Sequence, residues 1–379
     1  MKHSLLTVTL ILFFVSAGAQ AQSDYRVLPK DFNADKKQQM MRAYLRGYVH
    51  NALDQRLTEL EAALVSKKPF IAYQEKRRAA LHRSLGEMPE RSPLNARVTG
   101  VITENGFTIE KILFESQPGF HVTANLYRPG GAGPFPAILH PVGHSENGKS
   151  YDSYQRANRL LVQNGFVVLC FDPIGQGERK QLIDKAGKPF HRASHEHQEL
   201  GVAPILLGRS LGSYMVWDGV RAIDYLCSRP DVDPKRIGYY GLSYGGYSAI
   251  HLAPLIDRLA VTICSGNFND WRSKITSDKV NTSYLRHPDE DMYFWNCLHR
   301  FTHPELIAMT APRPFCIEFG TRDGITSPDW TAYAWKQTKE LFEHIGHADR
   351  VLMAEFEGGH EIKGTETFDF LDRWLMPGK

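Results

Sequence analysis

Cysteine is scarce in this chain, which has five cysteines among its 379 residues. No two of them form a C-x-x-C pair, so the pattern gives no support for a structural zinc site. Cys170, Cys264 and Cys316 each lie in an apolar run typical of a strand. We expect buried free thiols rather than a disulfide framework, because such frameworks are typical of much shorter secreted chains.

Long apolar runs and clusters of one charge sign are also missing after the first 21 residues. No later segment approaches the ~20 apolar residues that a transmembrane helix requires. The 45 basic and 42 acidic side chains are interspersed and leave a formal net charge of +3. A protein that binds the nucleic-acid backbone would instead present a clustered basic face. The composition therefore predicts no membrane span and no nucleic-acid partner.

The N-terminus has the parts of a cleavable export signal. Lys2 precedes an apolar run over residues 5–15, and small residues follow up to Ala19 and Ala21. The run is too short to cross a bilayer, and the small-x-small triplet suits signal peptidase. We expect cleavage after Ala21 and a mature protein that is periplasmic or secreted.

A helical N-terminal region is expected over residues 22–95. Polar, helix-forming residues dominate it, and apolar residues such as Met41, Leu45 and Tyr48 recur every three or four positions. That spacing predicts helices with one apolar face, which we expect to be joined near Pro69.

From residue 96 to the C-terminus, strands and helices alternate. Strands are expected over residues 107–114, 121–127, 137–140, 167–171, 236–240, 259–264, 314–319 and 350–356. Helices are expected over residues 213–227, 330–345 and 367–375. The alternation predicts an α/β fold with a mostly parallel central sheet flanked by helices. In such sheets the reactive groups gather at the carboxyl ends of the strands.

The alternation stops over residues 267–303, an insertion rich in aromatic side chains. These are Trp271, Tyr284, Tyr293, Phe294, Trp295 and Phe301. They either pack the insertion onto the body of the domain or belong to a cap that lines a substrate cleft. We take Trp271 and Trp295 as candidates for substrate contact.

The most specific motif is the G-x-S-x-G pentapeptide at residues 241–245, centred on Ser243. It follows a strand-like run at 236–240 and precedes a helix-like run at 247–252. This is the setting of a nucleophile elbow, a sharp turn that exposes a serine hydroxyl to a histidine. The flanking glycines allow the strand and the helix to approach each other closely.

A base and an orienting acid follow in the chain order of this architecture, which is serine, acid, histidine. Asp323 and His360 each come directly after a predicted strand. We expect Asp323 to orient the imidazole of His360, which then accepts the proton of Ser243. Glu357 and Glu361 are alternative acids, but they adjoin the histidine and suit solvated loop charges.

Two backbone N–H groups are expected to stabilise the oxyanion that forms during acyl transfer. The first belongs to Tyr244, directly after the nucleophile. The second is expected in the loop after the strand at 137–140, where Gly143 lets the chain turn so that the amide of His144 faces inward.

The loop at residues 172–179 is rich in glycine, but its spacing matches neither a P-loop nor a dinucleotide-binding fingerprint. We interpret it as a structural loop in which Arg179 faces the cleft. One helical turn separates Asp218 from Arg221, and we expect an ion pair between them or bonds from the helix to a loop.

His195 and His197 raise the possibility of a metal site. Two ligands alone do not define one, and the spacing supplies no third. The sequence therefore predicts neither a metal nor a cofactor.

From about Val98 to the C-terminus, the chain resembles the α/β-hydrolase superfamily. Segments 214–226 and 229–238, together with the loop at 172–179, are similar to the exported bacterial acetylxylan-esterase-like family. The helical N-terminal region also matches that group. The resemblance implies a serine carboxylesterase without a cofactor, which removes acyl groups from plant polysaccharides or related sugars.

The resemblance also assigns the catalytic triad to Ser243, Asp323 and His360, but it departs from the family after the nucleophile. The run from Tyr244 to Gly246 resembles the prolyl-oligopeptidase group, whereas acetylxylan esterases commonly have glutamine after the serine. A serine peptidase is therefore an alternative, although the propeller that precedes such domains is missing. A glucuronoyl esterase is another, although that group has arginine after the serine.

A non-catalytic carbohydrate-binding protein is a further alternative, and the intact serine, aspartate and histidine argue against it. The expected partner is a small-molecule or polysaccharide ester. The pattern favours no particular oligomeric state.

Overall fold

The computed structural model describes residues 27–29, 34–277, 283 and 293–378. The expected export signal, with its cleavage site after Ala21, lies outside the described residues, as does Tyr284 of the insertion. The chain divides into two compact units, residues 1–48 and 49–379.

In the first unit, the described structure consists mainly of the beginning of helix α2 (Ala34–Ala63), which continues into the second unit. Met41, Leu45 and Tyr48 are exposed on this helix. The helix predicted for this part of the chain is present. The Tyr44 and Tyr48 hydroxyls, one turn apart, lie 3.1 Å from each other.

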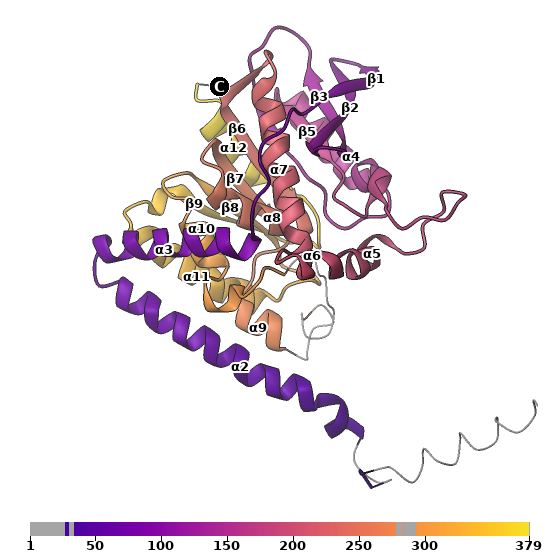
Figure 1. Cartoon of the computed structure of the whole chain (residues 1–379). Helices are drawn as coiled ribbons and strands as arrows, with labels where there is room; N and C mark the ends of the chain where they lie inside the picture. Colours follow the sequence, from indigo (N-terminus) through magenta and orange to yellow (C-terminus); the bar gives the residue numbers. More distant parts are fainter. Residues whose placement is uncertain (1–26, 30–33, 278–282, 284–292, 379) are drawn as a thin grey trace, which may run out of the picture. The chain divides into compact units, whose positions relative to one another are not determined.

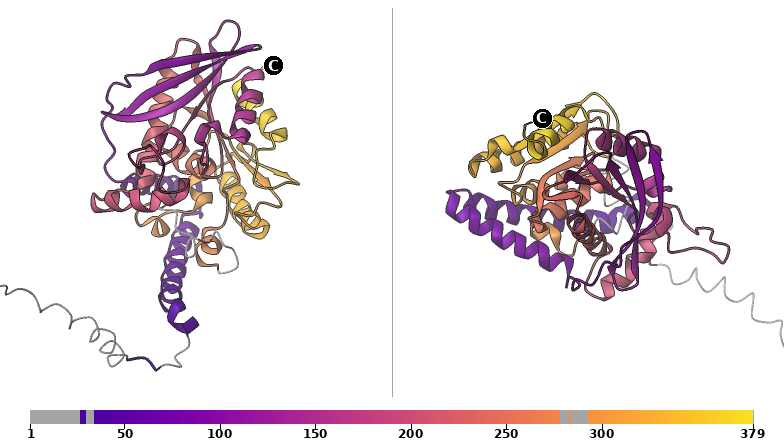
Figure 2. Two further views of the ribbon diagram at one scale, coloured as in Figure 1. Left: turned by 90° about the vertical axis from the view of Figure 1, so that its right-hand side faces the viewer. Right: turned by 90° about the horizontal axis from the view of Figure 1, so that it is seen from above.

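A nine-stranded sheet forms the centre of the second unit, counted over the residues that the structure describes (Figures 1 and 2). Its strands are β1 (Arg97–Glu104), β2 (Phe107–Gln117), β3 (Phe120–Pro129), β4 (Phe135–Leu139), β5 (Val167–Phe171), β6 (Val232–Leu242), β7 (Leu259–Ser265), β8 (Phe315–Gly320) and β9 (Val351–Phe356). Their order across the sheet is β1-β2-β3-β5-β4-β6-β7-β8-β9. The pairs from β1 to β5 are antiparallel, and those from β5 to β9 are parallel.

Helices cover both faces of the sheet (Figure 2), and those from α4 to α11 lie in the connections between its parallel strands. They are α3 (Lys67–Leu85), α4 (Asp152–Gln163), α5 (Ala193–Leu200), α6 (Val202–Leu206), α7 (Leu211–Ser228), α8 (Tyr244–Leu252), α9 (Trp271–Thr276), α10 (His303–Ala308), α11 (Pro328–His344) and α12 (Thr365–Leu375). Crossovers of this kind bury both faces of a parallel sheet, which explains the continuous apolar runs of strands β4 and β5 and the complete burial of β8.

Two hydrophobic cores lie on opposite faces of the sheet, because successive strand side chains point to opposite sides. In β4, Ala137 and Leu139 belong to the core that includes α7, α8 and α11. Ile138, between them, belongs to the core that includes α4 and α12. The sheet is thus held between two layers of helices.

Helix α3 packs on the second unit through an apolar stripe that includes Phe70, Tyr73, Leu81 and Leu85. It begins at Lys67, so the junction with α2 lies before Pro69 and the proline falls in the first turn, where it costs no intrahelical hydrogen bond. Buried Glu305 of α10 accepts hydrogen bonds from Arg56 and Tyr73. These contacts attach the helical region to the connection between β7 and β8.

All five cysteines lie in the described residues and are free thiols, and four of them are buried. This confirms the expectation of small buried hydrophobes. Within the described ranges, no helix is both long and apolar enough to cross a membrane.

Candidate active site

Ser243 occupies the turn between β6 and α8 in a conformation that L-residues rarely adopt, with φ 62° and ψ −124°. Such strain is typical of a nucleophile elbow. The glycines around it are required for close approach. A Cβ on Gly241 would lie 2.3 Å from the Gly245 carbonyl oxygen, and one on Gly245 would lie 2.5 Å from that of Pro141. The sequence therefore forces the serine onto a tight, partly exposed turn.

The structure brings Asp323 and His360 together from the ends of β8 and β9. His360 Nδ1 lies 2.8 Å from Asp323 Oδ2. The carboxylate is almost wholly buried, with 1% of its side chain exposed, whereas 27% of the imidazole is exposed. Asp323 Oδ1 accepts the backbone N–H of Ile325 at 2.8 Å. Both carboxylate oxygens are thus engaged, which fixes the acid relative to the imidazole.

The other imidazole nitrogen is available for the nucleophile. Within the described part of the chain, His360 Nε2 is buried and has no hydrogen-bond partner. The ring lies against the turn after β7, where a Cβ on Gly266 would be 2.8 Å from His360 Cε1. The preceding residue, Ser265, accepts the backbone N–H of Ser243 at 2.9 Å. The end of β7 thus borders both the serine and the histidine.

The two alternative acids do not take the place of Asp323. Glu357 pairs with Arg322 at 2.5 Å, and its side chain is 82% exposed. Glu361 is exposed on the loop after the histidine. The carboxylate that contacts the imidazole is the one that follows β8, as the strand-end argument predicted.

The two predicted oxyanion donors belong to neighbouring residues. The rings of His144 and Tyr244 stack with centroids 5.2 Å apart and an interplanar angle of 25°. On either side of His144, the amide of Gly143 donates to the Tyr154 hydroxyl at 2.7 Å and that of Ser145 donates to Gln176 at 2.6 Å. These bonds hold the loop after β4 beside the nucleophile.

His140, at the start of the same loop, stays neutral. Its Nδ1 lies 2.6 Å from Asn158 Oδ1 of α4. Complete burial lowers the pKa of His140 to about 4, because desolvation disfavours the charged imidazolium. A neutral imidazole here adds no charge beside the oxyanion loop.

The glycine-rich loop at 172–179 is structural, and its glycines surround a protein carboxylate. Asp172 is fully buried and accepts the Thr123 hydroxyl and the Lys149 amide, each at 2.7 Å. Gly148 and Gly177 both have φ +53°, and a Cβ on either would collide with this carboxylate. The glycines therefore allow the backbone to wrap around Asp172.

The position of Arg179 corrects one prediction and decides between two alternatives for Asp218 and Arg221. Arg179 is buried, and its guanidinium donates to Asp218 at 2.7 Å and to the Asp172 carbonyl at 3.0 Å. It is a structural cation and does not face a cleft. Asp218 therefore pairs with this loop arginine, while Arg221 pairs with Asp224 at 2.5 Å and donates to the Ser92 carbonyl. Of the two alternatives for Asp218 and Arg221, the bonds from the helix to a loop are the ones that form.

The two tryptophans proposed to contact substrate differ in exposure. Trp271, at the start of α9, is 2% exposed and packs edge-on against His303, with ring centroids 5.3 Å apart. Its position supports the packing interpretation of the insertion and overturns substrate contact. Phe294 likewise stacks on Tyr247. Trp295 is 72% exposed, and its contact with substrate stays a prediction.

His197, one of the two histidines considered for a metal site, has a structural role. It is buried, and its Nε2 lies 2.8 Å from the Ile174 carbonyl oxygen. Over the residues that the structure describes, no group of three or more His, Cys, Asp or Glu side chains is arranged to hold a metal.

Sequence reasoning missed Glu318, a buried carboxyl within β8. Its Oε1 accepts the backbone N–H groups of Lys363 and Gly364 at 3.1 and 2.9 Å, and its Oε2 accepts the Tyr240 hydroxyl at 2.8 Å. Burial raises the pKa of Glu318 above its ordinary value. The residue ties the loop after His360 to the strand that carries the nucleophile. A single acid inside an otherwise apolar strand was the signal that would have found it.

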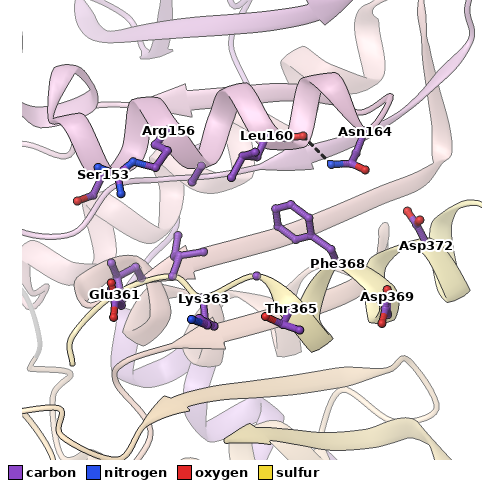
Figure 3. A pocket seen from close by; sticks show the side chains of 14 residues that line it. Ser153, Arg156, Leu160, Asn164, Glu361, Lys363, Thr365, Phe368, Asp369 and Asp372 are labelled. Atoms are coloured by element: carbon purple, nitrogen blue, oxygen red, sulfur yellow. Dashed lines mark hydrogen bonds between the residues drawn. The ribbon is translucent and has the colours of Figure 1, made fainter. Parts of the chain in front are cut away.

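A cavity of about 430 Å³ opens beside this loop, between α4 and the start of α12 (Figure 3). Leu242, directly before the nucleophile, and Glu361, directly after the histidine, both line it. Figure 3 shows the Phe368 ring projecting toward α4, where Arg156 and Leu160 lie. The wall thus combines apolar side chains with charged groups of both signs.

Comparison with known proteins shows what the fold and motifs are similar to. The model of the acetyl xylan esterase (AXE1) family matches residues 95–300, more than half of the chain. YtaP of Bacillus subtilis (strain 168), described as a candidate hydrolase, is 27% identical over 315 residues, which cover 79% of this chain and 99% of YtaP.

Two solved structures of esterases share the architecture. Acetyl xylan esterase 1 from Thermoanaerobacterium sp. JW/SL YS485 superposes with a TM-score of 0.55 at 19% identity, covering 79% of this chain and 93% of that one. A glucuronoyl esterase from Solibacter usitatus superposes with a TM-score of 0.58 at 18% identity, covering 82% and 93%. At these identities the likeness concerns the fold, and the predicted α/β-hydrolase architecture is confirmed.

Proposed function

Because the chain belongs to the acetyl xylan esterase family, we propose that it removes acyl groups from plant polysaccharides or related sugars through an acyl-serine intermediate. The chain is an enzyme of the serine hydrolase class, and its family was correctly predicted from the segments before the nucleophile, chiefly residues 214–226 and 229–238. One observation carries the proposal. A buried aspartate, Asp323, contacts the imidazole of His360, and the second imidazole nitrogen has no hydrogen-bond partner among the described residues, while Ser243 occupies a strained turn.

The proposed reaction uses these groups in turn. His360 Nε2 accepts the proton of Ser243 as Oγ attacks the ester carbonyl, and Asp323 stabilises the imidazolium. The N–H groups of Tyr244 and His144 stabilise the oxyanion. The imidazolium then gives its proton to the alcohol oxygen as the carbonyl–oxygen bond breaks. A water, activated by the same imidazole, releases the acid and restores the serine.

The sugar is proposed to occupy the cavity between α4 and α12. His360 must reach the oxygen of the leaving alcohol, so the sugar lies on the histidine side of the serine. The cavity adjoins that side, since Glu361 and Leu242 line it. Arg156 and Lys363 line it together with the acidic side chains of Glu361, Asp369 and Asp372. Mixed charges beside an aromatic ring suit a neutral, polyhydroxylated ligand better than an anion or an acyl chain.

A substrate panel tests the proposal. The purified protein is assayed on acetylated xylan, a feruloyl ester, a methyl glucuronate ester, an aryl acetate and a set of peptides. The expected result is hydrolysis of the acetyl esters, lost in Ser243→Ala. Preferred cleavage of the glucuronate ester would favour a glucuronoyl esterase, and preferred cleavage of peptides would favour the peptidase suggested by Tyr244 and the two glycines after it.

A further inference from the structure

Lys274 is a buried cation in α9, outside the triad. Its side chain is 2% exposed, and its Nζ donates to the Ile325 carbonyl oxygen at 2.6 Å. Burial of an ammonium group is costly unless it is paired or hydrogen-bonded. An apolar side chain at this position would avoid that cost. The presence of a lysine therefore indicates that its hydrogen bond to the Ile325 carbonyl has a role.

A continuous line of hydrogen bonds leads from this lysine to the catalytic imidazole. Lys274 Nζ binds the Ile325 carbonyl, and the Ile325 N–H donates to Asp323 Oδ1 at 2.8 Å. Asp323 Oδ2 in turn lies 2.8 Å from His360 Nδ1. The backbone carbonyl of Ile325 is thus bound by Lys274, and its backbone N–H is bound by Asp323.

The lysine is itself fixed at the start of its helix. Asp270 caps α9 through the N–H groups of Arg272 and Ser273, at 3.3 and 3.0 Å. The backbone N–H of Lys274 donates to the Asp270 carbonyl at 2.9 Å. The capped helix therefore fixes the backbone of Lys274, and with it the position of the ammonium group next to the loop after β8.

We propose that Lys274 is a positioning residue that holds the loop after β8 so that Asp323 meets His360 in the productive orientation. This inference rests on the proposed function, because it assigns the lysine to the same proton transfer. The cation reaches the catalytic acid through Ile325, whose carbonyl accepts from Lys274 and whose N–H donates to Asp323. Its loss is expected to reduce the rate of the chemical step more than substrate binding.

The test replaces the lysine with an uncharged side chain of similar length, Lys274→Met. With an aryl acetate, kcat is expected to fall about 10- to 100-fold, the usual effect of a small misplacement of a catalytic group, while KM changes less than twofold. The low-field proton NMR signal of the hydrogen between His360 Nδ1 and Asp323 is expected to shift or disappear. A purely structural lysine would lower stability and leave this signal unchanged.

Lys336→Met is the matched control, because Lys336 lies on α11 and its side chain is 75% exposed. It should change neither kcat nor the proton signal. If Lys274→Met fails to fold, Lys274→Gln, which keeps an N–H donor but is shorter, carries the same prediction. A folded variant with wild-type kcat and an unshifted signal overturns the proposal. Because the signal requires no substrate, it reports on Lys274 even if the wild-type protein hydrolyses no ester.

Discussion

Substitutions at Asp323 and at Glu357, two of the carboxylates considered as partners of His360, test which of them orients the imidazole. Asp323→Asn keeps the shape of the acid but lets the imidazole adopt the wrong tautomer, so kcat is expected to fall about 10⁴-fold. Glu357→Gln is the matched control, because Glu357 is exposed and paired with Arg322, and it should retain activity within about twofold. Steady-state kinetics on an aryl acetate measure both. Equal losses in the two variants would contradict the assignment of the acid.

Glu318 makes a prediction about pH and stability. Its pKa in the folded protein is raised by burial, so the folded state binds this proton more tightly than the unfolded chain does. The stability that it contributes is therefore complete below the ordinary glutamate pKa and is lost as pH rises through the raised value. Glu318→Gln removes this titration, so the variant should gain stability relative to wild type as pH rises across that window.

Urea unfolding at several pH values measures this difference. Glu318→Ala is the companion variant, since it leaves the amides of Lys363 and Gly364 without their acceptor and should cost about 1–3 kcal/mol. A difference between wild type and Glu318→Gln that does not vary with pH would show that the carboxyl keeps its ordinary titration.

Elements with a clear hydrophobic signal were the ones that the sequence predicted well. The buried strands β4, β5 and β8 and the long helix α7 were all found near their observed positions. Strand β1 was missed because nearly all of its side chains are exposed, which leaves no alternation to detect. The short helices α5 and α6 were also missed, since each spans too few turns to establish a helical period.

Site residues that follow the ends of strands could be predicted from the sequence. Predictions for the site that depended on side-chain packing were wrong. Asp323 and His360 follow adjacent parallel strands, so topology alone placed them together. Arg179 also follows a strand, but its partner Asp218 comes from a helix distant in sequence, and only the three-dimensional structure reveals that ion pair. The burial of Trp271 likewise depends on contacts with His303 across the insertion.

The cavity between α4 and α12, here also called the groove, yields a prediction about substrate binding. Phe368→Ala removes the aromatic wall of the proposed sugar site, so KM for acetylated xylo-oligosaccharides should rise about tenfold, equivalent to about 1.4 kcal/mol of binding. KM for a small aryl acetate, which does not need the groove, should stay the same. Phe190→Ala is the control, as this phenylalanine is 65% exposed and does not line the cavity. An unchanged KM for the oligosaccharide would exclude the groove from the path of the sugar.

For the molecule as a whole, a polysaccharide substrate is consistent with export of the enzyme. We propose that residues 1–21 direct export and are then removed. When the full chain is expressed in a bacterium, the active enzyme should be recovered from the periplasm or medium with Gln22 as its first residue. Intact-mass analysis and N-terminal sequencing check this. Active enzyme that retains residues 1–21 would contradict the predicted cleavage.

The triad as a working unit is tested most directly by covalent labelling with a fluorophosphonate, followed by mass spectrometry of the peptides. Our account predicts one adduct, on Ser243, that is absent in Ser243→Ala and forms far more slowly in His360→Ala. A folded protein that forms no adduct, or labelling of Ser243 at an equal rate without the imidazole, would contradict it.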